Sequence, residues 1–172
     1  QLTARSTLGV GSTFASDLSV MPVQNTFDQT AHRPTQRQGR IVGLKPNQPA
    51  YKILVVDDVA LNRKLLTHLL RGIGLDVQEA NNGKEAVDYW QAWQPDLIWM
   101  DMRMPVMDGE EAVRRIKLLD HSQRTCVIAL TASAFDDNRT TALASGCDDF
   151  VSKPIQANAI LEKMAQHLGI RY

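Results

Sequence analysis

The chain has 172 residues, of which 44% are hydrophobic, so it is long enough for one globular domain with additional segments and is not disordered throughout. Nineteen basic residues balance nineteen acidic ones, which gives no reason to expect nucleic acid or an anionic membrane as a partner. Two cysteines are too few for a disulfide framework, and no apolar run approaches the roughly 18 residues needed to cross a bilayer.

The first 49 residues contain two segments that differ from the rest of the chain. The run "LGVGSTFASDL", residues 8–18, holds a Gly-x-Gly, but no preceding strand, following helix or lysine supports a phosphate-binding loop there. Residues 19–49 are rich in Gln, Thr, Arg, Asn and Pro and show no sustained apolar period. We therefore predict a flexible linker over 19–49 and a globular domain over 50–172.

From residue 51 onward, short apolar runs alternate with longer segments of helical period, which is typical of βαβ units around a parallel sheet. Strands are predicted at Lys52–Val56, Asp76–Ala80, Asp96–Met100, Cys126–Leu130 and Asp149–Val151. Helices are predicted near Ala60–Gly72, Lys84–Trp93, Glu110–Leu119, Ala134–Ser145 and Gln156–Leu168. The first helix is expected to bury one apolar stripe, made of Leu61, Leu65, Leu66, Leu69, Leu70 and Ile73. The strict alternation predicts an α/β fold, a three-layer doubly wound sandwich around a five-stranded parallel sheet.

Polar side chains stand where the predicted strands end. In folds of this kind the ligand site lies beyond the carboxyl ends of the strands, and those ends carry Asp57, Asp58, Asp101, Thr131 and Lys153. Three carboxylates that converge raise one another's pKa values unless a cation lies among them. Oxygen ligands without His or Cys favour a hard ion, so the sequence predicts a site for Mg²⁺, with Mn²⁺ as the alternative.

Each of these features is ordinary when taken alone. An Asp-Asp pair after a strand is most often a solvated loop start, a Lys-Pro pair is most often a turn, and Thr131 could cap the helix that follows it. Phe150 is, by residue type, a core aromatic. The acidic pair, the single Asp, the hydroxyl and the Lys-Pro occur in order at successive strand ends, and this joint placement favours a functional site.

The runs "ILVVDD", "DMRMPVMDG", "ALTA" and "GCDDFVSKPI" resemble the receiver domain of two-component response regulators, over about residues 51–168. The resemblance implies a flavodoxin-like sheet of order 2-1-3-4-5. It also implies a phosphorelay module, not an enzyme, in which Asp101 accepts a phosphoryl group from a phosphohistidine. The implied partner is a histidine kinase or a histidine phosphotransfer protein, and whether the module forms a homodimer is left open.

The resemblance further implies a set of metal ligands. Asp58, Asp101 and the backbone carbonyl of Arg103 would bind Mg²⁺ directly, and Asp57 would help through a water molecule. Oxygen donors of this kind suit an ion that keeps some of its waters and accepts a phosphoryl oxygen.

Three other residues receive roles from the same resemblance. Lys153 would contact the phosphoryl oxygens, Thr131 would hydrogen-bond them, and Phe150 would turn inward on activation. We also expect a cis peptide between Lys153 and Pro154, since X-Pro bonds have only a small trans preference.

Two runs suggest the protein from which the receiver comes. "DDVALNRKLL" resembles receivers fused to hybrid histidine kinases, and residues 8–18 resemble the last strand of a histidine kinase ATP-binding domain. We therefore expect the C-terminal receiver of a hybrid sensor kinase, with residues 1–18 as an orphaned strand that does not bind ATP. The alternative is a free-standing single-domain response regulator. The chain is expected to be cytoplasmic, without membrane contact of its own, whether or not the parent is membrane-anchored.

Two other classes of function fit the sequence less well. An aspartate-nucleophile phosphatase needs a second acid two residues after its nucleophile, and Arg103 occupies that position. Arginine cannot exchange the required proton at neutral pH. A transcription factor needs a DNA-binding domain, and none follows the last predicted helix. We therefore expect a signalling module.

Overall fold

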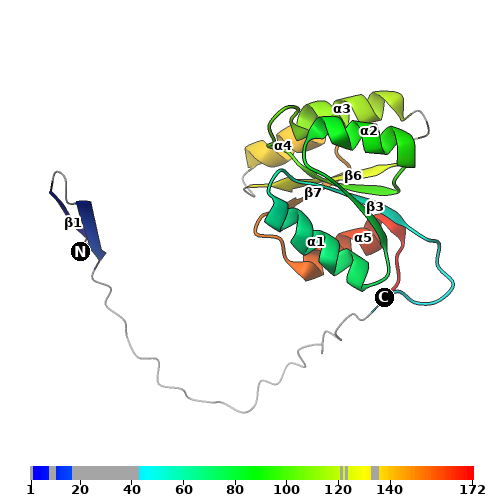
Figure 1. Cartoon of the computed structure of the whole chain (residues 1–172), viewed down its shortest axis with the longest axis horizontal. Helices are drawn as coiled ribbons and strands as arrows, with labels where there is room; N and C mark the ends of the chain where they lie inside the picture. Colours follow the sequence, from blue (N-terminus) through cyan, green and yellow to red (C-terminus); the bar gives the residue numbers. More distant parts are fainter. Residues whose placement is uncertain (1, 8–10, 17–42, 121, 123, 133–135) are drawn as a thin grey trace, which may run out of the picture. The chain divides into compact units, whose positions relative to one another are not determined.

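Figure 1 shows the computed structural model of the chain, which describes residues 2–7, 11–16, 43–120, 122, 124–132 and 136–172. The chain divides into two compact units, with the boundary after residue 39. None of the helices in these described ranges combines the length and the apolar character that crossing a membrane requires.

The described residues of the first unit form two paired strands. Strand β1 (Leu2–Thr7) pairs antiparallel with β2 (Gly11–Ser16), in a register that runs from Leu2 opposite Ser16 to Thr7 opposite Gly11. Gly11 begins β2 with a φ of 124°, a value that L side chains rarely adopt. The sequence predicts one orphaned strand in residues 1–18, whereas the structure forms two. Pairing with its own continuation satisfies backbone groups that a lone strand would leave unpaired.

The second unit contains a five-stranded parallel sheet of order β4-β3-β5-β6-β7. Its strands are β3 (Lys52–Val56), β4 (Asp76–Ala80), β5 (Leu97–Asp101), β6 (Cys126–Thr131) and β7 (Asp149–Ser152). Numbered within this unit alone, the order is 2-1-3-4-5, so the predicted fold class is confirmed. Strands β5 and β6 each end one residue later than predicted, which makes Asp101 and Thr131 the last residues of their strands.

Helices cover both faces of the sheet (Figure 1). On one face lie α1 (Ala60–Gly72) and α5 (Ala157–Leu168). On the other lie α2 (Gly83–Trp93), α3 (Gly109–Leu119) and α4 (Asp136–Ala144). Asn82 and Asp108 cap α2 and α3, because their side chains accept hydrogen bonds from backbone N–H groups in the first turn.

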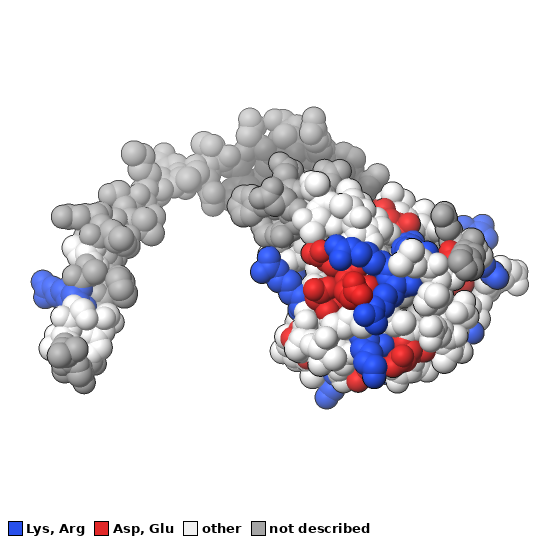
Figure 2. Space-filling view, turned by 90° about the horizontal axis from the view of Figure 1, so that it is seen from above, with Lys and Arg blue, Asp and Glu red and all other residues white. Residues whose placement is uncertain are grey.

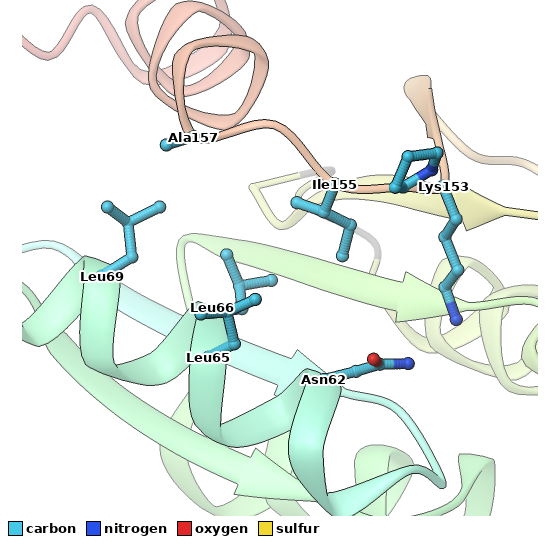
Figure 3. Close-up of a pocket in the computed structure, with 8 residues that line it drawn as sticks. Asn62, Leu65, Leu66, Leu69, Lys153, Ile155 and Ala157 are labelled. Carbon is cyan, nitrogen blue, oxygen red and sulfur yellow. The ribbon is translucent and has the colours of Figure 1, made fainter.

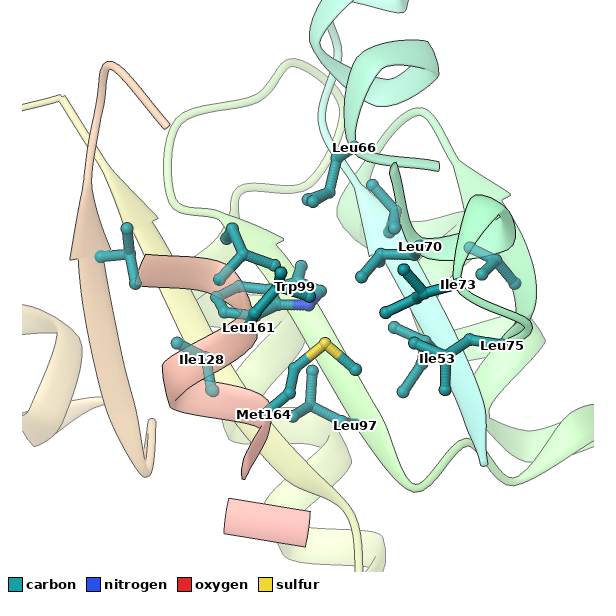
Figure 4. Packing of buried hydrophobic residues seen from close by; sticks show 14 of the residues in the cluster. Ile53, Leu66, Leu70, Ile73, Leu75, Leu97, Trp99, Ile128, Leu161 and Met164 are labelled. Atoms are coloured by element: carbon teal, nitrogen blue, oxygen red, sulfur yellow. The ribbon is translucent and has the colours of Figure 1, made fainter. Parts of the chain in front are cut away.

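Two hydrophobic clusters fill the space between the sheet and these helices. The cluster under α1 and α5 surrounds Trp99, which packs with Leu70 and Met164 (Figure 4). The opposite cluster includes Met100 and Ile116. Because side chains alternate between the faces of a strand, β5 contributes to both clusters. It is therefore fixed from both sides along its whole length.

The exposed side of α3 carries two ion pairs between residues four apart. Arg114 lies 3.2 Å from Glu110, and Arg115 lies 2.7 Å from Glu111. Figure 2 shows Lys and Arg side chains interspersed with Asp and Glu side chains on the face that it presents. Exposed pairs of this kind contribute little to stability, and mixed charges give that face no extended field of one sign.

Only part of the predicted apolar stripe of α1 is buried. Leu66 and Leu70 pack into the core, but Leu61 is 76% exposed and Leu65 is 65% exposed. The predicted stripe was too wide, because a helix on a sheet buries only the side that faces the strands. Leu61 and Leu65 therefore leave apolar surface on the outside of α1. Exposed apolar surface of this kind can mark a binding site where it adjoins a cavity.

The globular unit begins before residue 50. Leu44 packs against the cluster that surrounds Trp99, and the Lys45 N–H donates to the Arg171 carbonyl at 2.9 Å. Gln48 exchanges two hydrogen bonds with the main chain of Arg171, each 2.7 Å long. Residues 43–49 therefore dock against the end of the chain and do not belong to the predicted flexible linker. The predicted linker from 19 to 42 lies outside the described residues.

We predict that a chain beginning at Gly43 is more stable than one beginning at Tyr51 by about 1–3 kcal/mol, because the shorter chain loses the apolar contact of Leu44 and the bonds of Gln48. Urea unfolding of the two truncated proteins measures the difference. Gln48→Ala in the longer chain should remove part of it. Equal unfolding midpoints for the two chains would show that residues 43–49 add no stability.

Candidate functional site

The carboxyl ends of three strands bring two acidic residues and a lysine together at one edge of the sheet. Asp57 follows β3, Asp101 ends β5, and Lys153 follows β7. The Lys153 Nζ lies 2.9 Å from Asp57 Oδ2 and 2.8 Å from Asp101 Oδ2. Asp57 is 1% exposed and Asp101 is 7% exposed. A single ammonium group therefore bridges two buried carboxylates.

The members of the acidic pair are held differently. Asp57 Oδ1 accepts a hydrogen bond from the Val59 N–H at 2.8 Å, and Asn62 Nδ2 lies 3.3 and 3.2 Å from the two carboxylate oxygens. The Asp58 side chain is exposed. Among the described residues, the Asp58 carboxylate has no hydrogen-bond or ion-pair partner. The position of the Asp58 carboxylate therefore depends on the main chain.

Three carboxylates converge closely enough to share a cation. Asp57, Asp58 and Asp101 can each offer one oxygen, and these oxygens lie within 4.8 Å of one another. A donor set made only of oxygens suits a hard divalent ion such as Mg²⁺. The exposed Asp58 leaves one side of the cluster open to solvent. These residues fit the ion that the sequence predicts.

Burial and charge act in opposite directions on the bridged groups. Burial raises the pKa of the Asp101 carboxyl above its usual range, while the hydrogen bond and charge of Lys153 and the N–H of Arg103 oppose the rise. Burial alone would lower the pKa of Lys153, but its bonds to Asp101 and Asp57 outweigh burial and raise it. Lys153 is therefore protonated at neutral pH, and its charge favours the ionised form of Asp101.

A small cavity of about 70 Å³ lies beside Asp101 and is lined in part by Arg103 and Thr131. The Arg103 N–H lies 3.3 Å from Asp101 Oδ1, and within the described part of the chain its exposed guanidinium makes no ion pair. Thr131 is buried at the end of β6. The start of α3 also packs tightly here, since a Cβ on Gly109 would collide with the Asp101 carbonyl oxygen.

Two further expectations concern β7 and the turn after it. Phe150 is partly buried and packs against the cluster that includes Met100. The peptide bond between Lys153 and Pro154 is cis, as the sequence predicts.

Two residues of α1 contact the site although the sequence assigned them no role. Asn62 contacts the Asp57 carboxylate, and Arg63 Nη1 donates to the Asp57 carbonyl at 2.7 Å. The available signal was their placement, because they are polar residues in a leucine-rich helix, less than two turns after the acidic pair. Helical periodicity shows that they avoid the core but does not show what they contact.

An apolar groove of about 390 Å³ adjoins the acidic cluster (Figure 3). Residues of α1 form one side, and the segment from Lys153 to Ala157 forms the other. Figure 3 shows Lys153 and Asn62 at one end of the groove and Leu69 at the other. The exposed Leu65 lies along it. The groove thus extends from the charged site over apolar surface.

Comparison with known proteins agrees with this geometry. Residues 53–165 match the family described as the response regulator receiver domain. Chemotaxis protein CheY of Bacillus subtilis is 38% identical over 121 residues, which cover 70% of this chain and 99% of that protein.

Two solved structures are also similar. The receiver domain of sensor histidine kinase PA1611 from Pseudomonas aeruginosa, with a magnesium ion coordinated in its active-site cleft, has a TM-score of 0.65 and 31% identity and covers 70% of this chain and 99% of that one. The second is the co-crystal structure of the Saccharomyces cerevisiae histidine phosphotransfer protein Ypd1 with the receiver domain of Ssk1. It has a TM-score of 0.66 and 31% identity, and the match covers 69% of this chain and 89% of that one.

We predict that Lys153→Met lowers the stability of the metal-free protein by about 1–3 kcal/mol, because two buried carboxylates lose the cation that they share. The rise in melting temperature on adding Mg²⁺ should then be larger in the variant than in the wild type. Lys163→Met is the matched control, since that ammonium pairs with Asp149 at 2.6 Å, outside the site. A Mg²⁺ effect that is equal in all three proteins would contradict this electrostatic account.

Proposed function

The chain belongs to the family of response regulator receiver domains, which are signalling domains of two-component systems, and from this premise we propose that Asp101 accepts a phosphoryl group from a phosphohistidine. One contact above all supports the proposal, the 2.8 Å approach of Lys153 Nζ to Asp101 Oδ2 at the edge where the acidic residues converge. A carboxylate must be ionised to attack phosphorus, and the adjacent ammonium favours that form.

The proposed transfer is a simple displacement. An Asp101 carboxylate oxygen forms a bond to phosphorus while the bond between phosphorus and the imidazole nitrogen of the donor breaks, and the imidazole leaves and takes up a proton. The protein's contribution in such reactions is mainly to position groups and to balance charge on the phosphoryl oxygens. Lys153 and Thr131 lie at the ends of adjacent strands, and we propose that they contact those oxygens.

We propose that Asp58, Asp101 and the backbone carbonyl of Arg103 bind Mg²⁺ directly, and that Asp57 helps through water. When bound, the ion supplies a second cation, in addition to the Lys153 ammonium, for the phosphoryl oxygens. The all-oxygen cluster supports this assignment, as does the magnesium ion in the cleft of the similar Pseudomonas receiver.

The switch is proposed to involve Thr131 and Phe150. An acyl phosphate on Asp101 adds negative charge and acceptor oxygens next to the Thr131 hydroxyl, which can draw the end of β6 toward it. Phe150 lies at the border of a hydrophobic cluster and is only partly buried. Deeper burial of its ring would therefore gain apolar contact in a second position of this region.

The phosphohistidine donor is proposed to dock on the groove between α1 and the Lys153–Ala157 segment. A donor must place its histidine over Asp101, and the groove continues from that point as apolar surface that includes Leu65. Grooves of this form suit an apolar helix face on the partner. The similar yeast receiver was crystallised with a histidine phosphotransfer protein, which supports a donor of that class.

We further propose that the receiver belongs to a hybrid sensor histidine kinase. The run "DDVALNRKLL" and the run at residues 8–18 support this origin, and one similar structure is the receiver of a sensor kinase. Turnover as a phosphatase is disfavoured, because Arg103 occupies the position where that chemistry needs an acid.

Incubation with acetyl phosphate and Mg²⁺ should add one phosphoryl group to the wild type, seen as a shift in intact mass, and Asp101→Asn should abolish the addition because an amide is not a competent nucleophile. Asp108→Asn is the control, since Asn also caps a helix and Asp108 lies in the next loop. Its labelling should equal that of the wild type. A phosphoryl adduct that persists in Asp101→Asn would refute the assignment.

Leu65→Glu should slow transfer from a phosphorylated histidine phosphotransfer protein about tenfold, because it places a charge in the centre of an apolar interface. Labelling by acetyl phosphate, which needs no docking surface, should stay within about twofold of the wild type. Leu118→Glu is the matched control, as Leu118 is 74% exposed on α3, away from the groove. Equal losses in the two variants, or none in either, would argue against the groove as the docking site.

A further inference from the structure

Arg63 connects the start of α1 to the main chain of the acidic pair. Its side chain is only 17% exposed. The Nη1 atom donates to the Asp57 carbonyl at 2.7 Å and lies 3.4 Å from the Asp58 carbonyl. Both carbonyls belong to residues whose carboxylates form the cation site. One guanidinium therefore holds the peptide units that carry two of the three carboxylates.

The opposite side of Arg63 is anchored on the neighbouring strand. Its Nε lies 3.6 Å from Glu79 Oε2 on β4. The other oxygen of Glu79 lies 3.7 Å from Arg71 Nη1, and Arg71 Nη2 donates to the Val77 carbonyl at 2.7 Å. Glu79 thus has an arginine on each side, and Arg63 is fixed between β4 and the loop after β3.

This anchoring matters more for Asp58 than for Asp57. The Asp57 carboxylate has its own partners in Val59, Asn62 and Lys153. The exposed Asp58 carboxylate has none among the residues described, so only its main chain can aim it toward Asp101. The Arg63 hydrogen bonds are made to that main chain.

We propose that Arg63 is a positioning residue for the cation site: it fixes the Asp57–Asp58 backbone and so directs the Asp58 carboxylate toward Asp101. The proposal rests on the function proposed above and assigns it a residue outside the ligand set. Outer residues that hold metal ligands in place commonly change metal affinity by about 10- to 100-fold when they are removed.

The direction in which Mg²⁺ affinity changes when Arg63 is removed separates this role from the alternatives. Arg63 carries a positive charge near the site, so a purely electrostatic role predicts that its removal tightens Mg²⁺ binding. A purely structural role predicts lower stability with unchanged affinity. Positioning predicts weaker binding. Arg71 provides the comparison, because it has the same charge and pairs with the same Glu79 but does not contact the acidic pair.

The test is a Mg²⁺ titration of the full chain by calorimetry, with melting temperature in the absence of Mg²⁺ as a check on folding. Arg63→Ala should raise the Kd about tenfold. Arg63→Lys should lie between Arg63→Ala and the wild type, since an ammonium lacks the planar fork that reaches two carbonyls and Glu79 together. Arg71→Ala should stay within about twofold of the wild type. If Arg63→Ala does not fold, Arg63→Gln replaces it with the same expectation.

A double-mutant cycle with Asp58→Asn identifies the route of the effect. If Arg63 acts through the Asp58 carboxylate, Arg63→Ala should change the Kd by less than about twofold in the Asp58→Asn background. A full tenfold effect there, or an unchanged or lower Kd in Arg63→Ala itself, would overturn the proposal. A wild type that fails to bind Mg²⁺ would instead contradict the function proposed for the site.

Discussion

The Lys153 ammonium between Asp57 and Asp101 is the interaction on which the rest of the site depends. Strands β3 and β5 are neighbours, and their carboxyl ends bring the two buried carboxylates to one lysine. Its Nζ lies 2.9 Å from Asp57 and 2.8 Å from Asp101. The hydrophobic clusters on both faces hold these strands in place, so the carboxylates cannot separate to reduce their repulsion. A cation must balance them. In the function that we propose, the same balance prepares the edge to receive a negatively charged phosphoryl group.

Helix α1 contributes to the core, to the acidic site and to the groove on which we propose that a partner docks. Its inner side, with Leu70, completes the core around Trp99. Its first turn supplies Asn62 to the Asp57 carboxylate and Arg63 to the adjacent main chain. Its outer side leaves apolar surface along a groove that leads to Lys153. A partner that docks on α1 would therefore contact the same helix that holds the acidic pair in position.

Much of the fold could be predicted because its signals are local. Buried parallel strands are short apolar runs, and the polar residues that end them mark one edge of the sheet, which is why the parallel sheet and the gathering of acidic residues followed from the sequence. The strand order followed from the resemblance to receiver domains. The misses involve exposure and contacts that no local pattern specifies. Periodicity could not show that Leu65 faces outward, and no local signal predicted that Gln48 bonds to Arg171, 123 residues later. The guanidinium of Arg63 could likewise not be assigned to backbone carbonyls from its position in a helix.

The central claim is that this charge-balanced edge forms an acyl phosphate on one particular carboxylate. The most direct test is to treat the protein with acetyl phosphate and Mg²⁺, reduce it with borohydride, and locate the product by peptide mass mapping. Hydride reduces an aspartyl phosphate to homoserine and leaves free carboxylates intact. We expect homoserine at position 101 alone. Homoserine at position 57 or 58, or at a position outside this cluster, would contradict it.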